Sequence, residues 1–144
     1  MNRDLVSDLS ALVLIPSATI SADNTPASVD LAGFRSCTLM IEVGAGGITF
    51  SGTNKVEFVL TESDDDSTYS NVVAADVIHA PITVASGIVY NLIVAHAAAT
   101  VVRIGYKGGK RYLKLLADFS GTHGAGTPIS AVAVLGHPTT GPVA

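Results

Sequence analysis

The sequence has no tryptophan, a single cysteine and few charged residues. Charged residues make up 14% of the chain and hydrophobic residues 48%, whereas an average soluble protein is roughly 25% charged. Cys37, as the only cysteine, has no partner for an intrachain disulfide. The apolar residues are spread along the chain, without the run of ~20 that a transmembrane helix needs. We therefore expect no membrane partner, and a surface partly covered by other chains.

The 144 residues fit one ordinary domain. We expect an N-terminal arm or a disordered end over residues 1–10, one β domain over residues 11–136, and a tail over residues 137–144 that frays or lies along a neighbour. Asp4 and Asp8 interrupt the start of the chain, which is atypical of a secretory signal. The net charge of −4 argues against nucleic acid as a partner.

Strand patterns recur along the chain and helical periodicity is weak. Short apolar or alternating segments lie between clusters of Gly, Pro, Asn, Asp and Ser, and predict about eight strands at residues 12–20, 38–43, 55–62, 72–78, 84–95, 100–107, 110–119 and 129–135. The fold class is therefore all-β, an antiparallel two-sheet β-sandwich that closes most readily as a jelly roll. An immunoglobulin-like sandwich is the nearest alternative, although its Cys–Trp–Cys pattern is absent.

Gly108 and Gly109 separate two strand-like segments and predict a two-residue hairpin turn, because glycine tolerates the positive φ such turns need. The turn would set the register. Four pairs of residues would then face one another: Lys107 and Lys110, Tyr106 and Arg111, Ile104 and Leu113, and Val102 and Leu115. The apolar pairs would point into the core.

Five of the eight basic residues fall on this predicted hairpin, and they are the candidate partner-binding residues: Arg103, Lys107, Lys110, Arg111 and Lys114. One interpretation is that lysines and arginines protect an exposed sheet edge from aggregation. A second is that this basic face docks on an acidic surface of another chain. A third and weaker one is nucleic-acid binding, for which an isolated short basic patch on an acidic protein is a poor electrostatic footprint.

Catalytic and metal-binding patterns are absent from the sequence. The glycine-rich stretch at residues 105–111 has the wrong spacing for a phosphate loop, with Arg111 where Ser or Thr is required. The acidic residues 64–66 suit a solvated turn better than a calcium loop, although cation binding stays open. His123 lies near Asp118 and Ser120 without a nucleophile elbow, which favours ordinary turn chemistry. We expect no enzyme activity, no metal and no cofactor, with Cys37 in the core.

Two parts of the chain resemble small virion proteins of tailed bacteriophages. Residues 56–69 resemble their strand, Ser-Asp-Asp loop and following aromatic, and residues 112–117 with 129–136 resemble their C-terminal half. The resemblance implies a capsid decoration (cement) protein made in the host bacterial cytoplasm. Such a protein binds the major capsid protein on the outer surface of the virion and clamps neighbouring capsomers. It also implies a homo-oligomer, for which we favour a dimer over a trimer.

Two other functions compete with this hypothesis. A jelly-roll module of a phage tail or fibre would bind a host glycan through exposed aromatics, yet the chain has only four Tyr and four Phe. A hydrolase on a β scaffold is disfavoured because the sequence carries no recognisable catalytic motif.

Overall fold

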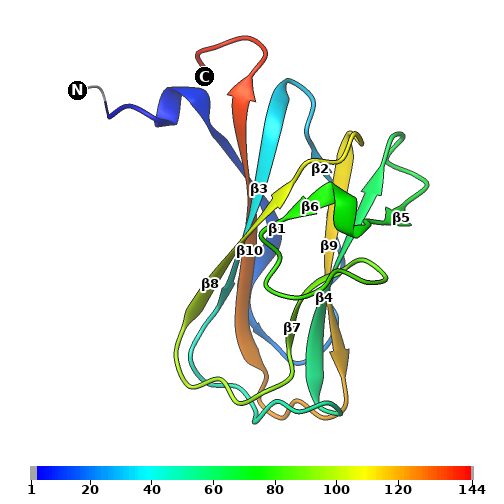
Figure 1. The fold of residues 1–144 in the computed structure, drawn as a ribbon. Coiled ribbons are helices and arrows are strands. Elements are labelled where there is room, and N and C mark those ends of the chain that lie inside the picture. The colour runs from blue at the N-terminus through cyan, green and yellow to red at the C-terminus, as the bar shows by residue number, and fades with distance from the viewer. Residues whose placement is uncertain (1–2, 144) are drawn as a thin grey trace.

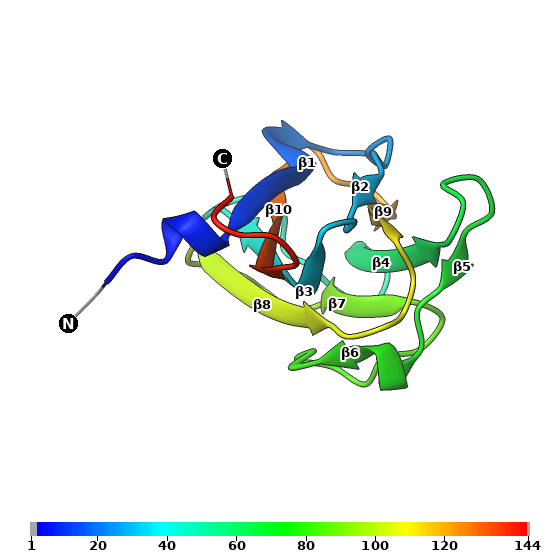
Figure 2. The same ribbon diagram turned by 90° about the horizontal axis from the view of Figure 1, so that it is seen from above.

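The computed structural model describes residues 3–143 and contains two antiparallel sheets packed face to face. Met1 and Asn2 of the predicted arm and Ala144 of the predicted tail lie outside the described residues. Sheet A has the strand order β1-β10-β3-β8-β6, and sheet B has the order β2-β9-β4-β5, with β7 also paired to β4. The all-β, two-sheet antiparallel sandwich is thus confirmed (Figures 1 and 2).

The strands of sheet A are β1 (Ser10–Ile20), β3 (Phe34–Val43), β6 (Val77–Ile78), β8 (Thr100–Tyr106) and β10 (Thr127–Pro138). Those of sheet B are β2 (Val29–Asp30), β4 (Lys55–Ser63), β5 (Ser70–Asn71), β7 (Ile88–Leu92) and β9 (Tyr112–Ser120). Two 3-10 turns, η1 (Val6–Asp8) and η2 (Ala74–Asp76), complete the elements. None of the helical elements within residues 3–143 is long and apolar enough to span a membrane.

The connections have the order of a jelly roll. If β5 and β6, each two residues long, are set aside, the remaining strands cross from one sheet to the other at every step except β4 to β7. Such alternation closes two Greek keys into one roll. The predicted strand at residues 72–78 is wrong, because η2 interrupts it: the Asp76 carboxylate accepts the Val73 amide (3.2 Å) and bends the chain.

The core lies between the sheets and follows the alternation of the sequence. In β3 the residues Cys37, Leu39, Ile41 and Val43 point inward, and in β4 the residues Val56, Phe58 and Leu60 do so. These seven side chains are buried between the two sheets, six of them completely. Burial of apolar surface, at about 25 cal/mol per Å², is the main source of stability. Cys37 is buried as expected.

Side chains of the segment that precedes β2 cover the part of the β9 edge that β2 leaves unpaired. The Asn24 amide donates to the Leu115 carbonyl (3.2 Å) and accepts the Ala117 amide (2.7 Å), as a neighbouring strand would. The Asp23 carboxylate accepts the Phe119 amide (2.7 Å) in the same manner. This edge of sheet B, beside β9, is therefore closed to further strand pairing, which otherwise promotes aggregation.

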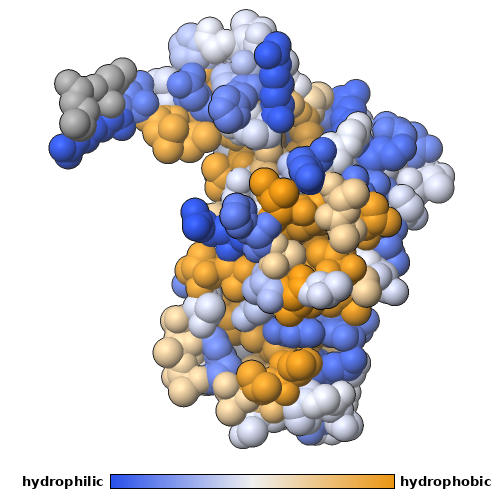
Figure 3. Space-filling view, viewed as in Figure 1, coloured by the Kyte–Doolittle hydropathy of each residue, from blue (hydrophilic) through white to orange (hydrophobic). Residues whose placement is uncertain are grey.

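The two ends of the chain lie at the same end of the sandwich. Residues 3–9 carry η1 and project from the body on the side of sheet A (Figures 1 and 2), and Figure 3 shows them overhanging that side. The predicted tail is bound to its own chain: β10 continues to Pro138, the Thr139 amide donates to the Gly33 carbonyl (2.8 Å), and the Val143 amide donates to the Ser7 carbonyl (2.8 Å).

Candidate functional site at the open end of the sandwich

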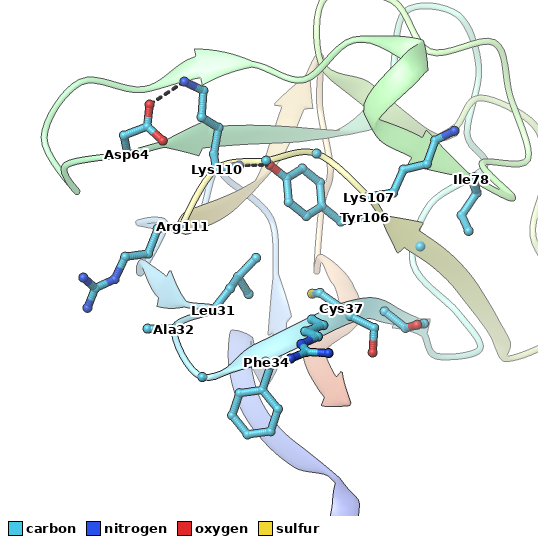
Figure 4. Close-up of a pocket in the computed structure, with 17 residues that line it drawn as sticks. Leu31, Ala32, Phe34, Cys37, Asp64, Ile78, Tyr106, Lys107, Lys110 and Arg111 are labelled. Carbon is cyan, nitrogen blue, oxygen red and sulfur yellow. Dashed lines mark hydrogen bonds and ion pairs between the residues drawn. The ribbon is translucent and has the colours of Figure 1, made fainter. Parts of the chain in front are cut away.

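A pocket of about 570 Å³ opens where the two sheets diverge, beside the start of β3 and the end of β8 (Figure 4). Pockets that bind small molecules usually have volumes of about 300–1,000 Å³. Three parts of the chain line it: the segment leading into β3, the connection from β8 to β9, and the single residues Asp64 and Ile78. Leu31, Cys37 and Tyr106 provide its less polar surface.

The connection from β8 to β9 crosses between the sheets, so the predicted hairpin is wrong. Neither Gly108 nor Gly109 has the positive φ that a two-residue hairpin turn requires. β8 pairs with β3 and β6, and β9 pairs with β4 and β2. Ile104 therefore lies opposite Leu39 rather than Leu113.

The other predicted pairs are replaced in the same way. Val102 lies opposite Ile41, Tyr106 opposite Cys37, and Leu115 opposite Leu60. The prediction that Ile104, Leu113 and Leu115 point into the core is nevertheless confirmed, because all three are fully buried.

Tyr106 explains why glycine follows β8. Its ring is 6% exposed and covers Gly108, where an added Cβ would lie 2.4 Å from the Tyr106 hydroxyl oxygen. The hydroxyl donates to Glu62 Oε2 (2.6 Å) and accepts the Lys110 amide (3.1 Å), which fixes the crossover to both sheets. Burial and the Glu62 carboxylate together raise the pKa of Tyr106 well above its usual value, so the phenol stays protonated.

Two of the predicted basic residues at the pocket are neutralised by acids of the same chain. Arg111 binds Asp30 through two hydrogen bonds of 2.8 Å, and these lower the pKa of Asp30 to about 2. Lys110 pairs with Asp64 at the mouth of the pocket, and the pairing raises the pKa of Lys110. A bidentate arginine–carboxylate pair of this kind fixes geometry more than it adds stability at an exposed site.

The structure does not place the five candidate residues on one surface. Lys107, Lys110 and Arg111 line the pocket. Arg103 lies on the outer face of sheet A, opposite Met40, and Lys114 lies on the outer face of sheet B with its ammonium 4.1 Å from the centre of the Tyr69 ring. The single basic face was expected because the hairpin was expected, and it is absent because β8 and β9 belong to different sheets.

Arg35 is a pocket residue that the sequence prediction missed. Side chains alternate between the two faces of β3, and Arg35 falls on the same, inward-facing side as the buried Cys37 and Leu39. It lies at the end of the strand, where the space between the sheets opens into the pocket. The sequence did contain a signal for this residue, because a charged side chain stands where the alternation of β3 calls for an inward apolar one. Within residues 3–143, neither Arg35 nor Lys107 has an ion pair, and these two exposed cations remain available at the rim.

The pocket offers binding groups and no activated nucleophile. Burial raises the pKa of the Cys37 thiol to about 12, which keeps it protonated and unreactive at neutral pH. No group of three or more metal-binding side chains occurs within the described part of the chain. The arrangement can bind an apolar side chain flanked by negative charge.

The remaining motifs of the sequence have structural partners. Asp65 accepts hydrogen bonds from the Thr68 and Ser67 amides (2.8 and 2.9 Å) and from Ser63 Oγ (2.8 Å), and these lower its pKa to about 2. His123 is buried at the opposite end of the sandwich, where its ring packs edge-on against Phe119. Asp65 therefore orders its own turn.

Comparison with known proteins found no matching family model, no similar curated protein and no similar solved structure.

Proposed function

We propose that the chain is a structural binding protein, a decoration protein of a tailed-bacteriophage capsid. It binds the major capsid protein on the outer surface of the virion. The observation that carries this proposal is the pocket at the open end of the sandwich, which has apolar side chains within it and the cations Arg35 and Lys107 at its rim. The resemblance of residues 56–69 and 112–117 to small phage virion proteins supports the same assignment.

The pocket suits a protruding segment of another protein. Leu31 points into the cavity and Cys37 lies at its base (Figure 4), so an apolar side chain of the partner would replace water there. Arg35 and Lys107 would attract an acidic residue next to that side chain. Charge complementarity of this kind gives specificity and speeds association, and it weakens in salt.

A modest site is sufficient for such a role. A capsid presents many identical positions, and an oligomeric decoration protein that engages two of them at once gains binding strength without new contacts. The stabilisation of the shell then comes from many weak contacts that join neighbouring subunits.

The glycan-binding alternative has less support at this site. A sugar ring stacks on an exposed aromatic face, and the Tyr106 ring of this pocket is almost entirely buried with its hydroxyl committed to Glu62.

The test is sedimentation of the purified protein with undecorated, expanded capsids of tailed phages. We expect binding at a fixed copy ratio, a higher rupture temperature of the capsids, and a loss of affinity of at least about tenfold in the Arg35→Glu/Lys107→Glu variant. The matched control is Lys55→Glu/Lys114→Glu, which changes the net charge equally on the outer face of sheet B.

Absence of binding to every capsid tested, or equal loss in the two variants, would refute the proposal. Circular dichroism of each variant establishes that the fold is intact.

A further inference from the structure

The outer face of sheet A is apolar although nothing within the described residues covers it. Its outward residues form rows across four strands, and the registers place Val13 beside Val132, Val132 beside Met40, and Met40 beside Arg103. Val13 is 57% exposed and Val101, two residues before Arg103, is 58% exposed. Single exposed apolar side chains are common on a monomer, but Val13, Val132 and Met40 are neighbours across three strands, and a contiguous apolar patch indicates an interaction surface.

The only charged residues at the centre of this face are Glu42 and Arg103. Glu42 lies opposite Val101 and Arg103 lies opposite Met40, so the two charges occupy one diagonal of a four-residue group. Diagonal neighbours in a sheet are about 7–8 Å apart. Within residues 3–143 neither residue has an ion pair, and Glu42 accepts only a long hydrogen bond of 3.5 Å from Ser130 Oγ.

This arrangement is self-complementary. A two-fold axis that bisects the line from Glu42 to Arg103 brings Glu42 of one copy onto Arg103 of the other, and the same rotation makes the reciprocal pair. Met40 and Val101 occupy the other diagonal, near the axis, where each copy would place its apolar side chains against those of its mate. An interface with an apolar centre and two symmetric charge pairs results.

We propose that the outer face of sheet A binds a second copy of this chain in a two-fold symmetric dimer. The five strands make this face about 20 Å wide and about 25 Å long, roughly 500 Å² in plan. A standard interface buries about 800 Å² on each partner, so the sheet supplies more than half of the required area.

The segment with η1 supplies further area beside the same face. Leu5 and Val6 are 63% and 79% exposed, and the segment overhangs the side of sheet A, with hydrophobic atoms on and below it (Figure 3). Beneath it lies a hollow of about 530 Å³ lined in part by Leu5, Leu9 and Val134. Val134 lies two residues from Val132 in β10, so the hollow adjoins the apolar row and would receive side chains of the second copy.

The proposal does not depend on the capsid role, because the dimer face and the open-end pocket are different surfaces. A protein that dimerises and ignores capsids would refute only the proposed function, and a monomer that binds capsids would refute only the dimer.

The experiment is sedimentation velocity of the full chain over a wide concentration range. We expect a dimer in the unmodified protein, dissociation constants raised at least about tenfold by Glu42→Arg and by Arg103→Glu, and recovery of the dimer in the double swap Glu42→Arg/Arg103→Glu. The matched control is the swap Lys55→Glu/Glu57→Lys on sheet B, which should dimerise like the unmodified protein.

Recovery in the double swap distinguishes a direct charge pair from a general loss of folding. A monomer at every concentration, a trimer, or a dimer unaffected by either single reversal would overturn the proposal.

Discussion

The two sheets have equivalent inner faces and very different outer faces. Inside, both present fully buried aliphatic residues such as Leu39 in sheet A and Leu60 in sheet B. Outside, sheet B carries charged residues, which include Lys55 and Glu57 in an ion pair of 2.9 Å. The corresponding surface of sheet A carries valines and Met40 beside the uncharged polar residues Thr38 and Ser130, and its two charges, Glu42 and Arg103, have no ion pair among residues 3–143. The inner faces thus explain why the chain folds, and the difference between the outer faces indicates which side meets another molecule.

Because the inner faces of the two sheets are equivalent, substitutions in either one should cause the largest and similar losses of stability. Leu39→Ala and Leu60→Ala each remove a fully buried side chain, and each should lower the free energy of unfolding by about 2–5 kcal/mol. Urea denaturation followed by circular dichroism measures the loss. A cost below about 1 kcal/mol in one sheet only would show that the core is not shared equally.

The second largest loss of stability is expected at the edge of sheet B, where Asn24 covers β9. Asn24→Ala leaves the Leu115 carbonyl and the Ala117 amide without their partner, and the free energy of unfolding should fall by about 1–3 kcal/mol. The control is Thr25→Ala. Thr25 is the next residue in the chain and its side chain is exposed, so this variant should change stability little. If both variants are equally stable, the amide of Asn24 does not act as a substitute strand.

Matched valines on the two outer faces sharpen the comparison directly. Val132 on sheet A and Val59 on sheet B are both half-buried. Val132→Thr should weaken self-association roughly tenfold, because each of the two copies loses a buried methyl worth about 0.8 kcal/mol. Val59→Thr should leave association unchanged.

Analytical ultracentrifugation of the two valine variants provides the measurement. Equal association constants would mean that the outer faces do not differ in function, whatever their composition.

Alternation in the sequence was sufficient to predict the fold class and the inward residues. Leu39, Ile41, Ile104 and Leu115 all point where their parity predicts, because burying one face of a strand requires a period of two. The choice of partner strand is not encoded in this period. Gly108 and Gly109 resembled a hairpin turn, and their actual role is to leave room for the Tyr106 ring on a path between the sheets.

The site was predictable only in part for the same reason. Lys107, Lys110 and Arg111 were found because they lie on one short segment, whereas Arg35 comes from a distant strand and meets them only in the folded chain. The pairing of Arg111 with Asp30 likewise joins residues far apart in sequence. No local sequence pattern distinguishes a basic residue that forms an ion pair within the chain from one that stays free to bind another molecule.

The smallest change in stability is expected from the ion pair that Asp30 of sheet B forms with Arg111 of the same chain. Asp30 is half-exposed and its pKa is lowered from 3.8 to about 2 by Arg111. A lowered pKa means that the folded state holds the proton less tightly than the unfolded state, so the pair stabilises the fold above about pH 4 and ceases to do so as the pH falls towards about 2. At neutral pH Asp30→Asn should cost less than about 1 kcal/mol, since solvent screens an exposed pair.

Melting temperatures measured against pH should therefore differ between the unmodified protein and Asp30→Asn at neutral pH and converge in acid. Asp118→Asn, which removes an acid on the same outer face with no ion pair among residues 3–143, controls for the loss of charge itself. A difference that persists at about pH 2 would mean that Asp30 stabilises the protein by packing rather than by its charge. Convergence would instead establish that Asp30 is satisfied by Arg111 within the chain, in contrast to Glu42 and Arg103 of sheet A, for which we propose a partner in the second copy.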